Sequence, residues 1–87
     1  MNPHDVVYTA FPDGTAALLH PEDLAFHALN GTGARVWAAV VAGEPLAGVV
    51  SALAAESGAP RAEVADAVGA FLDELAAAGF PVPSERP

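Results

Sequence analysis

The chain has 87 residues, 53% of them hydrophobic, which suits one domain with one core. It contains no cysteine, so disulfides, thiolate metal sites and cysteine nucleophiles are excluded. Three arginines and no lysine oppose eleven acidic residues, and the formal net charge of −8 disfavours nucleic acid and anionic membranes as partners. No apolar run approaches the roughly 18 residues of a membrane span, and no secretory signal opens the chain. We therefore expect a cytoplasmic protein with no membrane contact.

The first third of the chain predicts a small antiparallel sheet. Residues 6–11 and 15–19 are apolar and rich in strand-forming residues, and "PDG" between them is a turn signal. A second turn signal, "HPED", precedes residues 24–29, "LAFHAL", which we expect to form a third strand.

The remainder of the chain predicts three helices. Apolar residues recur at helical spacing from Ala34 to Gly43, over residues 46–57, and from Pro60 to Gly79. The final stretch, "FPVPSERP", is rich in proline and is expected to be unstructured. These patterns predict one α+β domain over residues 1–80, with the order β-β-β-α-α-α, and a flexible tail over residues 81–87.

The stretch "ALNGTGARVW" lies where the third strand is expected to give way to the first helix. Its two glycines raise the alternative of a phosphate-binding loop, but the spacing differs from the known phosphate motifs and no lysine is present. A strand-to-helix junction explains the residues better. Asn30 is positioned to cap the helix with its side-chain oxygen, and Thr32 is an alternative cap.

The same junction carries a resemblance to the PqqD-like family, the RiPP recognition elements that bind leader peptides. The run "DGTAALLH…LAFHALNGTGARVW" has the family's hairpin and strand, and "LAGVVSALAAESG" and "EVADAVGAFLDELAAAGF" resemble its second and third helices. The resemblance covers residues 6–80. Its paired signatures are Leu29-Asn30, Thr32-Gly33 and Val36-Trp37.

The resemblance implies a winged-helix-like fold and a binding function without catalysis, cofactor or metal. In this family a precursor leader peptide adds as a strand to the third strand, in a groove walled by the third helix. Carried over to this chain, the strand residues are Ala25, Phe26, His27, Ala28 and Leu29. The wall residues are Val64, Ala67, Val68, Phe71 and Leu72, of which Phe71 and Leu72 also fit plain core packing.

Two small-residue flanks border the apolar stripe of the third predicted helix. One flank carries Ala67, Ala70 and Ala78, and the other carries Ala65, Gly69 and Ala76. Small residues leave room for a second chain, but they are also good helix formers, and the pattern does not decide which flank lines the groove. The acidic residues of this helix are either a solvated face or an attraction for a basic leader or partner: Glu63, Asp66, Asp73 and Glu74.

The sequence gives little support to an enzyme or a metal site. Three histidines lack the spacing of metal ligands, and the serines lack the context of a nucleophile. These residues are His4, His20, His27, Ser51, Ser57 and Ser84. A winged-helix transcription regulator is a second class of hypothesis, but the third predicted helix contains only one arginine, at its start, and no lysine.

We therefore favour a stand-alone leader-binding protein of natural-product biosynthesis, with a lasso-peptide pathway first. Its partners would be a precursor leader peptide, a leader-cleaving protease and a cyclase. The alternative within the family is the peptide chaperone of pyrroloquinoline quinone synthesis, which serves a radical-SAM enzyme.

Overall fold

The computed structural model describes residues 2–22, 24 and 26–84. Its elements are a short 3-10 helix η1 (Pro3–Asp5), strands β1 (Val7–Ala10), β2 (Ala16–Leu19) and β3 (Phe26–Leu29), and helices α1 (Gly31–Ala42), α2 (Leu46–Ser57) and α3 (Arg61–Ala77). The strands form one antiparallel sheet in the order β1-β2-β3. The α+β fold and the β-β-β-α-α-α order predicted from the sequence are confirmed, whereas η1 was not predicted. Among the described residues, none of the helices combines the length and apolarity needed to span a bilayer.

The β1–β2 hairpin follows from its turn residues. The N–H of Phe11 donates to the carbonyl of Thr15 at 2.8 Å, and the N–H of Gly14 donates to the carbonyl of Phe11 at 3.2 Å. Gly14 has a φ of 90°, which glycine adopts without steric cost. The hydroxyl of Thr15 donates to Asp13 at 2.6 Å and lowers the pKa of that carboxyl.

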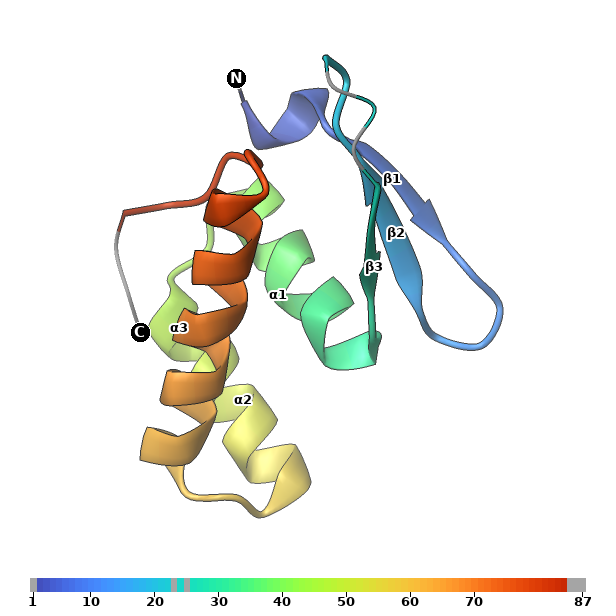
Figure 1. Cartoon of the computed structure of the whole chain (residues 1–87). Helices are drawn as coiled ribbons and strands as arrows, with labels where there is room; N and C mark the ends of the chain where they lie inside the picture. The colour runs from blue at the N-terminus through green and yellow to red at the C-terminus, as the bar shows by residue number, and fades with distance from the viewer. Residues whose placement is uncertain (1, 23, 25, 85–87) are drawn as a thin grey trace.

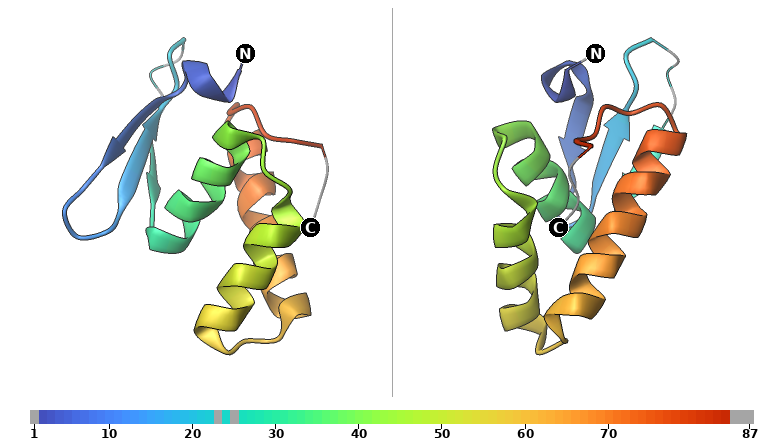
Figure 2. Two further views of the ribbon diagram at one scale, coloured as in Figure 1. Left: turned by 180° about the vertical axis from the view of Figure 1, so that it is seen from behind. Right: turned by 90° about the vertical axis from the view of Figure 1, so that its left-hand side faces the viewer.

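Two hydrophobic clusters form the core. One joins the inner face of the sheet to α1 and to the end of α3, and Trp37 and Leu75 lie at its centre. The other lies between the three helices, around Val50 and Leu72. Figure 1 shows α1 between the sheet and α3, and the views in Figure 2 agree. Both α1 and α3 contribute residues to the two clusters.

The segment after α3 returns to the sheet. Phe80 is buried in the sheet cluster, and its N–H donates to the carbonyl of Leu75 at 3.0 Å. His20, at the end of β2, is 4% exposed, and its Nε2 lies 3.1 Å from the carbonyl of Gly79. Phe80 begins the stretch expected to be unstructured, and it instead belongs to the core. Val82 also packs partly against both clusters, whereas residues 85–87 of the predicted tail lie outside the described residues.

Helix α1 begins directly after β3 because Asn30 caps it. The Oδ1 of Asn30 accepts from the N–H of Gly33 at 2.7 Å, as expected from the sequence, so Asn30 rather than Thr32 is the cap. Helix α1 therefore starts at Gly31, three residues before the predicted start at Ala34.

We expect Asn30→Ala to lower the free energy of unfolding by about 1 kcal/mol, because the N–H of Gly33 loses its partner. Urea denaturation followed by circular dichroism measures this change. Asn30→Asp keeps an accepting oxygen and should retain most of the stability. Equal losses in both variants would contradict the capping role.

Candidate functional site

Strand β3 is an edge strand, since the sheet ends with it in the described part of the chain. The hydrogen-bond pattern of the β1–β2 hairpin determines which backbone groups of β3 point away from the sheet. In an antiparallel ladder, the N–H and C=O of one residue point to the same side, and successive residues alternate. Phe11 donates to Thr15, one step beyond the Ala10–Ala16 pair. The backbone groups of Ala16 and Leu18 therefore point away from β1 and toward β3.

His27 and Leu29 lie opposite Leu18 and Ala16, so their backbone groups are directed to β2. It follows that Phe26 and Ala28 direct their N–H and C=O groups out of the sheet. The free edge thus offers two donors and two acceptors, from two residues that are not proline. An extended peptide needs this array to add as a strand.

The side chains of β3 alternate between the two faces of the sheet. Leu29 is buried, and the ring of His27 lies 6.1 Å from that of Phe80, so these two side chains face the helices. Phe26 is 67% exposed and Ala28 is also exposed, on the outer face. A strand added beside β3 would therefore meet apolar side chains on its outer face as well as its inner face.

A pocket of about 320 Å³ opens next to the end of β3, where Asn30 begins the turn into α1. Helix α3 forms one wall through Glu63, Val64, Ala67, Val68 and Phe71. The other walls come from the start of α1 with its cap, from the end of α2 and from the loop after α2. Their residues are Asn30, Thr32, Gly33, Val36, Leu53, Ser57 and Ala59.

Gly33 allows α3 to lie close to α1 at this pocket. A Cβ at this position would lie 3.2 Å from the Cε1 of Phe71 and 3.3 Å from the Oδ1 of Asn30. Any larger residue would displace the Phe71 ring or the capping side chain. The glycine after Thr32 is therefore explained by packing, which supports a junction rather than a phosphate loop.

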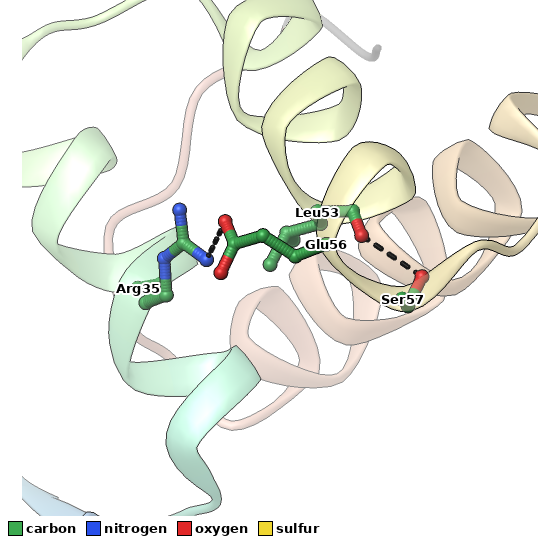
Figure 3. Close-up of polar contacts among 4 residues, drawn as sticks. All are labelled: Arg35, Leu53, Glu56 and Ser57. Carbon is green, nitrogen blue, oxygen red and sulfur yellow. Dashed lines mark hydrogen bonds and ion pairs between the residues drawn. The ribbon is translucent and has the colours of Figure 1, made fainter.

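The polar side chains of Ser57 and Asn30, which line the pocket, are already bonded within the protein. The hydroxyl of Ser57 donates to the carbonyl of Leu53 at 2.8 Å, and Arg35 pairs with Glu56 beside it (Figure 3). The side-chain oxygen of Asn30 is held by its cap. The pocket is thus largely apolar, and Glu63 is the charged residue in its lining.

The structure brings four of the five wall residues that the family resemblance implied to one pocket, whereas none of the described strand residues lines it. Val64, Ala67, Val68 and Phe71 line the pocket at the end of β3. Leu72 is fully buried in the helical cluster and does not line it. Of the two small-residue flanks of α3, only Ala67 lines the pocket, and Ala65 packs against the helical cluster. Ala25 lies outside the described residues.

The walls contributed by α1 and α2 were not predicted. Val36 and Leu53 appear in the sequence only as members of helical stripes, and nothing in the spacing brings those two helices together. The stretch "NGTG" indicated the strand-to-helix junction, but it did not indicate that this junction forms part of a pocket wall.

Within the described residues, no group of three His, Asp or Glu side chains is arranged to hold a metal ion. Both ring nitrogens of His20 have hydrogen-bond partners within the protein. Its Nδ1 accepts from the N–H of Glu22 at 3.2 Å, which leaves Nε2 to donate to Gly79.

The fold and the site define an α+β domain with an open strand edge beside an apolar pocket. Residues 15–80 match the family described as "Coenzyme PQQ synthesis protein D (PqqD)", and the chain belongs to this family. Its structure is similar to the solved structure "TbiB1 in Complex with the TbiA(beta) Leader Peptide", with a TM-score of 0.79 and 26% identity. That likeness covers 95% of this chain and 94% of the other. A comparison with curated proteins finds no match.

Proposed function

We propose that the protein binds the leader region of a ribosomally synthesised precursor peptide as a fourth strand on β3. The observation that carries the proposal is the free edge of β3, with the backbone groups of Phe26 and Ala28 directed outward beside the pocket. Membership of the PqqD family and the likeness to TbiB1, solved with a leader peptide, support the same ligand.

The affinity and the selectivity of leader binding come from different contacts. Four backbone hydrogen bonds contribute about 0.5–1.5 kcal/mol each, and an apolar side chain in the pocket adds about 1.5–3 kcal/mol. Ordering a flexible leader costs about 2–5 kcal/mol, and association costs more. Because backbone pairing accepts any sequence without proline, the pocket must supply the selectivity.

In this proposal the protein performs no reaction itself and presents the leader to separate enzymes. The partners are a leader-cleaving protease and a cyclase of a lasso-peptide pathway. The family description favours a second candidate, a peptide chaperone that serves a radical-SAM enzyme in pyrroloquinoline quinone synthesis. The genes beside this one distinguish the two, since the first requires a precursor gene next to protease and cyclase genes.

Titration of the cognate leader into the pure protein should give saturable binding, whereas the core peptide alone should give none. Isothermal calorimetry measures both, with a scrambled leader as the control for composition. Equal affinity for leader and core, or no binding of either, would contradict the proposal.

A further inference from the structure

Glu63 is the one charged side chain that lines the pocket at the end of β3. It is exposed and has no hydrogen bond or ion pair to another side chain in the described part of the chain. Its position in the first turn of α3 is favourable for an acid because of the helix dipole. Stabilising the start of α3 does not by itself require the carboxylate of Glu63 to lie at a pocket.

The arginines in the described part of the chain do not compensate this charge. Arg35 is paired with Glu56 (Figure 3), and Arg61 donates to the hydroxyl of Ser51 and to the carbonyl of Ala47. The whole protein carries a formal charge of −8, so its field adds to the local one. The pocket therefore combines an apolar wall with a negative charge that neither Arg35 nor Arg61 pairs.

We propose that this pocket takes a lysine or arginine side chain of the bound peptide. Such a side chain has an apolar stem and a charged end. The stem would pack against Val64, Ala67 and Phe71, and the charged end would reach the carboxylate of Glu63. The inference rests on the proposed function, because it assumes a peptide paired with β3 whose chain continues past Asn30 to the pocket.

The test uses a displayed library of random linear peptides, selected in parallel on the wild-type protein and on Glu63→Lys. Peptides paired with β3 are recognised because they do not bind Ala28→Pro. Among these, wild-type protein should enrich lysine or arginine at a fixed distance from the paired segment, and Glu63→Lys should enrich aspartate or glutamate there. Asp66→Lys, which makes the same charge change on α3 outside the pocket, should keep the wild-type preference.

A second measurement separates binding from helix stability. In one selected peptide, replacing the enriched lysine by norleucine keeps the stem and removes the charge. We expect this change to weaken binding to the wild-type protein about threefold to tenfold, and to leave binding to Glu63→Gln unchanged. If Glu63 only stabilises α3, both proteins will show the same ratio, and the inference is overturned.

Different results would contradict strand addition to β3 and the role of Glu63. Selected peptides that depend on β3 but carry no preferred cation would overturn the role of Glu63 and leave strand addition intact. If no selected peptide depends on β3, strand addition is wrong, and the inference that rests on it fails as well.

Discussion

Ala28→Pro is expected to weaken leader binding at least a hundredfold, about 2.7 kcal/mol, while the domain stays folded. Ala28 directs its N–H out of the sheet, so proline removes no bond to β2. The ring removes one donor for the leader and also holds the incoming strand away from the edge. All the backbone bonds of the added strand are therefore affected. Calorimetry measures the affinity, and circular dichroism with thermal melting checks the fold.

His27→Pro is the matched control for this substitution. It lies one residue earlier in the same strand, but its N–H is directed to β2, so proline there should destabilise the domain. Phe26→Pro should behave like Ala28→Pro, because Phe26 points outward as well. Phe26→Ala retains its N–H and should cost less than either outward-facing proline. Normal leader binding by folded Ala28→Pro would show that the leader does not pair with β3.

Ala67→Trp should weaken leader binding at least tenfold, about 1.4 kcal/mol. Ala67 is exposed and lines the pocket of about 320 Å³, so an indole there occupies space that a leader side chain needs. Backbone pairing with β3 would remain, which is why the expected loss is smaller than for Ala28→Pro. Fluorescence anisotropy with a labelled leader measures the change.

Ala76→Trp is the control for Ala67→Trp, since Ala76 is exposed on α3 but does not line the pocket. It should bind the leader like the wild-type protein. Val68→Asp is a poorer probe, although Val68 also lines the pocket. Val68 is 2% exposed, so a charge there would be buried and would unfold the domain. Equal binding by Ala67→Trp and Ala76→Trp, both folded, would place the selective contacts outside this pocket.

The sequence predicts the fold well because short local signals decide it. Gly14 ends the first strand, Asn30 caps the first helix, and Gly43 and Gly58 stop the first two helices with positive φ. Each signal acts within a few residues of the chain. The strand ends differ from the predicted ones by one or two residues, because pairing between strands sets those limits. Helix α1 starts three residues earlier than predicted because Asn30 caps it.

The site was predicted less completely because its walls come from segments distant in the sequence. The apolar stripe of α3 assigned Val64, Val68 and Leu72 to the same face of the helix. In the structure, Leu72 faces the other helices, whereas Val64 lines the pocket. Only the packing of α3 against α1 and α2 separates them. Phe80 was missed for a related reason, since its neighbours are prolines that indicate a tail, whereas its contacts lie on β2 and β3.

The return of Phe80 to the sheet bears on how the chain is synthesised. The strands leave the ribosome first, but an isolated three-stranded meander without its packed face is barely stable. The side chains that cover that face include Leu75 and Phe80, which come from the end of the domain. The sheet therefore completes its core only after residue 80 has emerged. Until then the inner face of the nascent sheet lacks the part of its cover that Leu75 and Phe80 provide.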